Sequence, residues 1–288
     1  MDDFKIQAQK QKLTINCKGK IIALNTPIVM GIINTTPDSF YEGSRKTNID
    51  AILFQADKML NEGASILDIG GYSTRPMAED VKIETEIERV IPTINEIHKR
   101  FPDAVISIDT FRSEVAEQAI TAGASIINDV SSGEDDENML TTVAMLNVPY
   151  IMMHKRGTPS TMQQLTNYEN ITAEIITYFN ARVALAKACG IKDIIIDPGF
   201  GFAKNLQQNY QLLNELNALT ILNLPILVGV SRKKMIQTVI NSNADAALNG
   251  TTTANTIALM QGANILRVHD VKEAMECINI VNATNGII

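Results

Sequence analysis

Acidic, amide and basic side chains recur where the short apolar segments of this chain end. The segment IVMGII at 28–33 is followed by Asn34, and VISI at 105–108 is followed by Asp109. The whole set comprises Asn34, Asp68, Asp109, Asn128, His154, Asp197, Lys233, Arg267 and His269. Carboxylates accept paired N–H donors of a flat ring in bidentate fashion, and basic side chains bind anions. Brought together, these side chains predict a site for a polar planar ring and a phosphate.

The basic residues indicate the anion half of that site. Arg267 and His269 are two residues apart at the end of an apolar segment, so both side chains leave the same face of a strand. Lys233 stands in SRKK at 231–234, where a helix is expected to begin, and cations there oppose the helix dipole unless an anion is bound. The alternative for any one polar residue is a helix cap or a turn. The three histidines are scattered, which is not a metal-ligand pattern.

Eight apolar segments, each followed by a helical pattern, predict the scaffold that brings these residues together. The strands are expected at 28–33, 65–69, 104–108, 125–127, 148–152, 193–196, 225–228 and 264–266. The helices are expected at 49–61, 83–99, 112–123, 137–146, 171–189, 208–219, 235–240, 246–261 and 271–282. This alternation is typical of an α/β protein with a (β/α)8 TIM barrel, whose strand ends all lie on one face. The alternative is an open doubly wound sheet, but no G-x-G-x-x-G follows an early strand.

A short segment precedes the predicted barrel. Residues 12–24 alternate loosely around Lys18-Gly19-Lys20, which predicts a small β-hairpin that plugs one end of the barrel. No linker or low-complexity stretch interrupts the chain. Residues 1–288 are therefore expected to form one TIM-barrel domain, with 1–26 as an N-terminal extension and hairpin.

Composition narrows the classes of partner. The net charge is −7, so no basic field attracts nucleic acid or an anionic membrane, and neither is expected as a partner. No apolar run approaches the roughly 20 residues that span a bilayer, and the first residues lack a signal-peptide pattern. A cytoplasmic location is therefore expected. Three cysteines far apart in sequence argue against a disulfide framework.

Seven short motifs resemble those of the dihydropteroate synthase family. They are NTTPDSF at 34–40, LDIGGYSTRP at 67–76, SIDT at 107–110, INDV at 127–130, DPGFGFAKN at 197–205, SRK at 231–233 and RVHDV at 267–271. The motifs stand in the family's order, and the resemblance runs from Pro27 to Thr284.

The resemblance implies a transferase of tetrahydrofolate biosynthesis. Such an enzyme condenses (7,8-dihydropterin-6-yl)methyl diphosphate with p-aminobenzoate to give 7,8-dihydropteroate and diphosphate by an SN1-like mechanism. The resemblance also implies Mg²⁺ as the cofactor, a homodimer, and competition by sulfonamides at the aminobenzoate site.

Individual residues receive roles from the same resemblance. The pterin would be held by Asp109, Asn128, Met153, Asp197 and Lys233. The diphosphate would be held by Asn34, Thr74, Arg75, Arg267 and His269, with Asn34 also a ligand of Mg²⁺. The aminobenzoate would contact Phe40, Phe202 and Lys234. The catalytic set would be Asn34, Glu42, Lys233, Arg267 and His269.

Three places differ from the family's usual pattern. Tyr41 and Glu42 stand where a small residue and an aspartate are usual, and Tyr72 replaces a glutamate. Lys234 replaces a serine that binds the aminobenzoate carboxylate. The Lys234 ammonium either binds that carboxylate or leaves only the backbone N–H to do so.

Three other activities are alternatives to a synthase. One is a non-catalytic pterin-binding relative, which would bind pterin and release no diphosphate. Another is a pterin-dependent corrinoid methyltransferase, which has no need of the TPDSF motif or of an Arg-His phosphate grip. The third is a lyase in which Lys233 forms a Schiff base.

Overall fold

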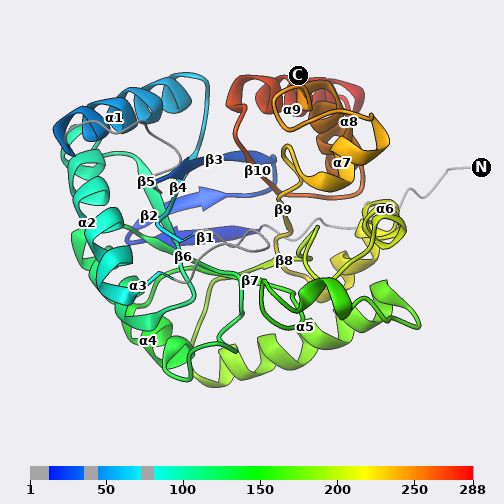
Figure 1. Ribbon diagram of the computed structural model, residues 1–288, viewed down its shortest axis with the longest axis horizontal. Coiled ribbons are helices and arrows are strands. Elements are labelled where there is room, and N and C mark those ends of the chain that lie inside the picture. Colours follow the sequence, from blue (N-terminus) through cyan, green and yellow to red (C-terminus); the bar gives the residue numbers. More distant parts are fainter. Residues whose placement is uncertain (1–12, 36–44, 73–80, 288) are drawn as a thin grey trace, which may run out of the picture.

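The structure of this protein is a computed structural model that describes residues 13–35, 45–72 and 81–287, with the backbone alone at 45–48. Parallel strands alternate with helices along most of this length (Figure 1). The strands after the N-terminal hairpin are β3 (Ile28–Asn34), β4 (Ile66–Gly70), β5 (Val105–Asp109), β6 (Ile126–Asp129), β7 (Tyr150–Met153), β8 (Ile194–Asp197), β9 (Leu227–Val228) and β10 (Ile265–Val268).

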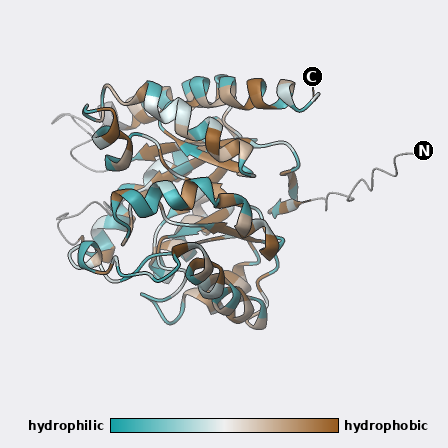
Figure 2. Cartoon of the chain, turned by 90° about the vertical axis from the view of Figure 1, so that its right-hand side faces the viewer, coloured by the Kyte–Doolittle hydropathy of each residue, from teal (hydrophilic) through white to brown (hydrophobic). Residues whose placement is uncertain are grey.

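Helices surround these strands. They are α1 (Arg45–Asn61), α2 (Ile83–Arg100), α3 (Ser113–Ala122), α4 (Met139–Leu146), α5 (Ile171–Ala188), α6 (Leu206–Asn214), α7 (Lys234–Val239), α8 (Leu248–Met260) and α9 (Val271–Thr284), with 3-10 turns η2 (Met162–Gln164) and η3 (Leu216–Leu222). Figure 2 shows apolar residues concentrated on the central strands, while the outer helices are apolar and polar by turns. The helices therefore bury one face against the strands and present the other to solvent.

The eight parallel strands form a barrel. Their order is β8-β7-β6-β5-β4-β3-β10-β9, and a parallel bridge between Ile196 and Ile226 joins the first strand of this order to the segment that enters the last. The predicted (β/α)8 TIM barrel is confirmed. An open doubly wound sheet is excluded because its edge strands would stay apart.

The inside of the barrel changes character along its axis. Near the amino ends of the strands the inward residues are apolar: Met30, Ile66, Val105, Ile126, Ile151, Ile195, Leu227 and Ile265 form one buried cluster. Because side chains alternate along a strand, the next inward residue lies two positions further on. On several strands that residue is polar, as at Asp68, Ser107, Asn128, Asp197 and Arg267. The carboxyl end of the barrel is thus its polar end.

A β-hairpin covers the apolar end. β1 (Thr14–Cys17) and β2 (Lys20–Ala23) pair antiparallel, and Ile15, Cys17 and Leu24 pack into the inner apolar cluster. The backbone N–H of Asn16 also donates to an Asp193 carboxylate oxygen at 3.0 Å, just before β8. The predicted plug is confirmed.

Two elements differ from the sequence-based expectation. The helix expected at 208–219 is split into α6 and η3. In a 3-10 turn residues three apart lie on the same side, so Leu216 and Leu219 both face the core, where both are fully buried. The strand expected at 225–228 is reduced to Leu227–Val228, because Pro225 has no N–H and the Ile226 N–H donates to the Asn264 side chain.

Removal of the hairpin's buried contact tests the plug. Ile15→Ala is expected to destabilise the protein by about 2–4 kcal/mol, because Ile15 is 1% exposed and truncation leaves a cavity beneath the barrel. Ile21→Ala is the matched control in the same hairpin, with a side chain that is 61% exposed, and should cost less than about 0.5 kcal/mol. Denaturant unfolding followed by circular dichroism measures both. Equal midpoints for the two variants would contradict the plug.

Candidate active site

The centre of the polar end is the guanidinium of Arg267 on β10. Its Nε donates to Asp68 Oδ2 at 2.6 Å, and its Nη2 contacts Asp109 Oδ2 at 2.6 Å. Asn128 Nδ2 donates to the same Asp68 oxygen at 3.1 Å. Four strands, β4, β5, β6 and β10, are therefore connected by one network of charged and amide groups inside the barrel.

Burial sets the protonation of this network. Burial raises the pKa of Asp109 to about 7; Arg267 opposes the shift, while the nearby Asp68 adds to it. Burial disfavours the charge of Arg267, yet Asp68 and Asp109 together hold its pKa above the ordinary arginine value. The guanidinium is thus permanently charged, whereas Asp109 exchanges a proton near neutral pH.

A second cluster forms around Asp197, the last residue of β8. Its Oδ1 accepts the Gly199 N–H at 2.8 Å, and burial raises its pKa although the charge of Lys233 opposes this. Lys233 Nζ donates to the Phe200 carbonyl at 2.6 Å and lies 5.0 Å from the centre of the Phe202 ring. Burial lowers the pKa of Lys233 to about 8, against the attraction of Asp197.

The loops after β9 and β10 are tied to each other. Ser231 Oγ lies 3.0 Å from His269 Nδ1, and the His269 N–H donates to the same hydroxyl at 3.3 Å. Arg232 makes a fork of two bonds to Asp270, at 2.9 and 2.7 Å, and its backbone has the left-handed φ of 56°. Such bidentate pairs fix orientation as well as charge. Lys233 directly follows Arg232 and His269 directly precedes Asp270, so this ion pair fixes the position of Lys233 relative to His269.

The structure places the remaining predicted residues around the same end. Asn34 is the last residue of β3 and is partly buried, and Met153 ends β7 with its side chain buried. Phe202 is partly buried in the loop after β8, whereas Lys234 is exposed at the first position of α7. Phe40, Glu42, Thr74 and Arg75 lie outside the described residues.

Two sequence-based expectations about the rim need correction. Asp68 does not end its strand, because β4 continues to Gly70 and places Asp68 deeper, fully buried below the rim. His154 is not free to meet a ligand: it is buried, with Nδ1 3.0 Å from Lys204 Nζ and its ring against Tyr178. The strand boundary and the partner of His154 both depend on tertiary contacts.

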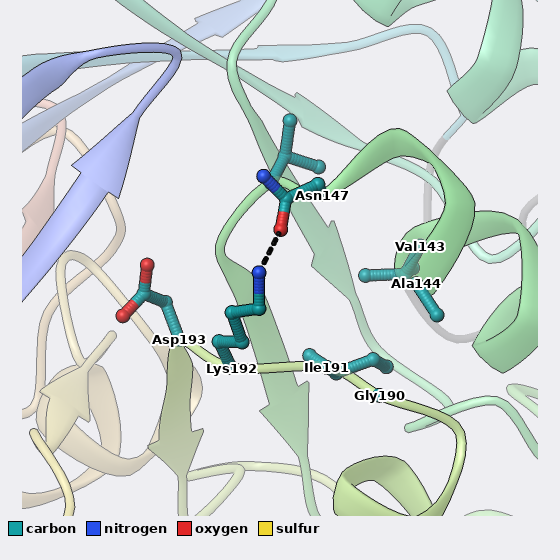
Figure 3. A pocket seen from close by; sticks show the side chains of 8 residues that line it. Val143, Ala144, Asn147, Gly190, Ile191, Lys192 and Asp193 are labelled. Atoms are coloured by element: carbon teal, nitrogen blue, oxygen red, sulfur yellow. Dashed lines mark hydrogen bonds between the residues drawn. The ribbon is translucent and has the colours of Figure 1, made fainter.

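A small cavity at the opposite end is not part of this site. It is lined by residues next to the amino ends of β7 and β8, including Val148, Ile191 and Asp193. Figure 3 shows the Lys192 ammonium bonded to Asn147 Oδ1 there, at 3.1 Å. A cavity of about 10 Å³ has room for no more than a water molecule.

Comparison with known proteins places this arrangement in a family. The profile of the family described as "Pterin binding enzyme" matches residues 30–269. The dihydropteroate synthase of Escherichia coli K12 is 43% identical over 269 residues, which are 93% of this chain and 95% of that protein. The chain belongs to the dihydropteroate synthase family. It is an enzyme of the transferase class, in folate synthesis.

Solved structures of the family share the fold. The Xanthomonas albilineans dihydropteroate synthase with 4-aminobenzoic acid has a TM-score of 0.89 and 37% identity, and the match covers 96% of this chain and all of that one. The Yersinia pestis enzyme with a sulfonamide drug has a TM-score of 0.90 and 40% identity, covering 95% of this chain and all of that one. In the described part of this family member, no helix is long and apolar enough to cross a bilayer.

Sequence reasoning missed two side chains that shape this site. Ser231 stands in the SRK motif, but nothing in the sequence predicts that its hydroxyl contacts His269. Lys204 stands in the DPGFGFAKN motif, but the composition of that loop does not predict that the side chain is only 3% exposed. A cation directly after a Gly-rich loop was the one available signal.

The raised pKa of Asp109 predicts a pH-dependent stability. The native state binds a proton more tightly than the unfolded chain, so this group's contribution falls as pH rises from about 4 to about 7. Asp109→Asn should lack that part of the decline, so its stability relative to the wild type should increase across this window. Urea unfolding at several pH values measures the effect. Asp103→Asn, on an exposed residue just before β5, is the control; parallel curves for the wild type and Asp109→Asn would refute the assignment.

Proposed function

We propose that this family member condenses (7,8-dihydropterin-6-yl)methyl diphosphate with p-aminobenzoate, giving 7,8-dihydropteroate and diphosphate. The observation that carries the proposal is the polar end of the barrel, where Asp109, Asn128 and Asp197 face the same interior as Lys233 and Arg267. Carboxylate and amide acceptors suit the amino and ring N–H groups of a pterin, and a cation suits its carbonyl oxygen. Met153 would pack against the ring from the end of β7.

Arg267 is also suited to the diphosphate. Its Nε and Nη2 are bonded to Asp68 and Asp109, while Nη1 donates to no protein acceptor among the described residues. A guanidinium held in place by two carboxylates has little freedom left to lose when it binds an anion through its remaining edge. His269, fixed by Ser231, would bind the phosphates beside it, with Thr74 and Arg75 from the loop after β4.

The chemistry requires no protein nucleophile. Electrons of the dihydropterin expel diphosphate and leave a cationic methylene group. The neutral arylamine then attacks this group and loses one N–H proton to solvent, which gives the neutral product. Arg267 and His269 would stabilise the departing charge, and Glu42 would stabilise the cation. The carboxylates of the pterin pocket favour the same cation. This is the SN1-like order of events.

Asn34 would hold Mg²⁺ together with the diphosphate. Its Oδ1 stands at the end of β3, and both it and Asp109 Oδ2 lie within 4 Å of the place where a side chain on Gly70 would begin. Among the described residues no three His, Cys, Asp or Glu side chains gather to hold a metal. One or two protein oxygens fit Mg²⁺, which commonly takes its other ligands from phosphate and water. When bound, Mg²⁺ neutralises charge on the leaving diphosphate.

The aminobenzoate site would lie beside the loops after β8 and β9. Phe202 would form one wall and Phe40 another, and the Xanthomonas relative solved with 4-aminobenzoic acid supports this substrate. Lys234 is exposed at the start of α7, where its ammonium and its backbone N–H both remain available to a carboxylate. The Yersinia relative bound to a sulfonamide drug supports inhibition of this enzyme by sulfonamides.

Diphosphate release tests the proposed reaction. Purified protein with the pterin diphosphate and Mg²⁺ should release diphosphate when p-aminobenzoate is present and form dihydropteroate, confirmed by mass.

Asp197→Asn should bind a diphosphate-free dihydropterin about 10-fold to 100-fold more weakly, because it loses a charge-assisted bond worth about 1.5–3 kcal/mol. Binding of pterin without diphosphate release would favour a non-catalytic relative. Methyl transfer to a corrinoid protein would favour the methyltransferase.

We also propose that the enzyme is a homodimer, associated through α6, α7 and α8. A groove of about 430 Å³ lies between these helices, lined by Tyr210, Ile236 and Ala254 among others. Its rim carries exposed apolar residues, including Val239, at 60% exposure, and Ile257, at 39%. A contiguous apolar patch of this kind is typical of a protein interface.

The cytoplasmic location expected from the sequence stays a prediction.

A charge placed in the groove tests the dimer. Ile257→Glu should shift the protein from dimer to monomer in sedimentation velocity, because a carboxylate buried in an apolar interface is unpaired. Ile280→Glu, on an exposed residue of α9 outside the groove, is the control and should leave the dimer intact. A wild-type protein that sediments as a monomer at micromolar concentration would contradict the proposal.

A further inference from the structure

The buried ammonium of Lys204 lies next to the site, in the loop between β8 and α6. Lys204 is 3% exposed. Its Nζ lies 2.9 Å from the Gly199 carbonyl oxygen, 3.0 Å from the Phe202 carbonyl oxygen and 3.0 Å from His154 Nδ1. An ammonium has three N–H donors, and here each has one acceptor.

His154 supplies the acceptor that comes from outside the loop. Burial, with the charges of Lys204 and Arg156, lowers the pKa of His154 to about 2, so its ring is neutral and Nδ1 can accept. The ring packs edge-on against Tyr178, with centroids 4.8 Å apart. Burial likewise lowers the pKa of Lys204 well below the lysine value, while Asp197 favours its charge. The contact joins the end of β7 to the loop after β8.

The loop held by Lys204 has an unusual backbone. Gly199, Gly201 and Ala203 have φ values of 71°, 83° and 47°, in the left-handed region. A Cβ on Gly199 would lie 2.0 Å from the His154 carbonyl oxygen, so the loop passes too close to β7 for any other residue. Few backbone bonds maintain such a path; the Phe202 N–H bonds to the Gly199 carbonyl at 3.1 Å. Lys204 Nζ donates to the same Gly199 carbonyl and also to the Phe202 carbonyl.

The same loop presents groups to Lys233. The Phe200 carbonyl accepts from Lys233 Nζ at 2.6 Å, and the Phe202 ring lies 5.0 Å from it. Lys204 Nζ binds the carbonyl of Gly199, the residue before Phe200, and the carbonyl of Phe202 itself. Two lysines therefore bind this loop: Lys204 through the Gly199 and Phe202 carbonyls, and Lys233 through the Phe200 carbonyl. Loss of the Lys204 contacts would move the Phe202 ring and the Phe200 carbonyl together.

We propose that Lys204 is a positioning residue for this reaction: by drawing Gly199, Phe202 and His154 around one ammonium, it holds the Phe202 ring where p-aminobenzoate binds. The proposal rests on the proposed function. Lys204 touches neither substrate in this scheme and acts through the loop. Asp109, Asn128 and Asp197, which are proposed to bind the pterin, lie on strands, and Lys233 meets the loop only through the Phe200 carbonyl among the described residues. Aminobenzoate binding should therefore respond more strongly than pterin binding when Lys204 is changed.

Lys204→Met tests this role because it keeps the apolar stem and removes all three donors. The KM for p-aminobenzoate should rise about tenfold or more, since misplacement by about 1 Å costs up to about 100-fold. The Kd of a diphosphate-free dihydropterin, measured by calorimetry, should change less than about twofold. Lys187→Met makes the same chemical change on an exposed residue of α5 and should leave both constants at wild-type values.

The outcomes separate a positioning role from a structural one. Partial unfolding would reduce the active fraction and leave both constants unchanged, so unaltered constants in folded Lys204→Met overturn the proposal. Equal weakening of both substrates overturns it as well. If Lys204→Met does not fold, His154→Phe decides, because it keeps the ring contact with Tyr178 and removes one acceptor; it should raise the aminobenzoate KM, and an unchanged KM refutes the proposal. Absence of turnover by the wild type would instead refute the proposed function.

Discussion

The site depends on one buried guanidinium held between two carboxylates. A carboxylate inside a barrel is costly to ionise unless a cation lies beside it, and removing one partner of such a set leaves the other charge unpaired. Arg267 supplies the cation for Asp68 and Asp109 and thereby links side chains of β4, β5 and β10. The attraction is incomplete, because burial still raises the pKa of Asp109 to about 7. A network balanced in this way can accept a ligand's N–H donors or a proton with little rearrangement.

Outside this network the loops are positioned by pairs of side chains. Arg232 joins the loop after β9 to Asp270 after β10, and Ser231 joins it to His269. Lys204 joins the loop after β8 to His154 after β7. Each pair connects neighbouring strands of the barrel. The groups proposed to bind the diphosphate and the aminobenzoate therefore sit on loops whose positions are fixed by their neighbours, which is what a reaction with two substrates in sequence requires.

The two ends of the barrel have different roles, because the inward-facing residues of the strands are apolar at one end and polar at the other. Below the polar layer, the inward residues are apolar and the hairpin covers them with Ile15 and Leu24. This end supplies burial energy, and none of its described residues is a candidate ligand group. Above it, charge collects at the carboxyl ends, where eight loops can vary without disturbing the apolar layers. The division places stability and chemistry at opposite ends of the same strands.

The sequence by itself determined the strands, most of the helices, the barrel and the rim, because these follow from local apolar periodicity and from the rule that parallel strand ends share a face. It also determined, through motifs, the family and the candidate residues Asp109, Asn128, Asp197, Lys233 and Arg267. Only the tertiary structure decided which of these side chains bond to one another. The depth of Asp68, the bonds of Arg267 to two strands distant in sequence, and the burial of His154 against Lys204 arise from barrel closure, which brings together residues such as Asp68 and Arg267, 199 positions apart. Local pattern carries no information about such distances, since the register between strands is set by packing and not by the residues of one strand.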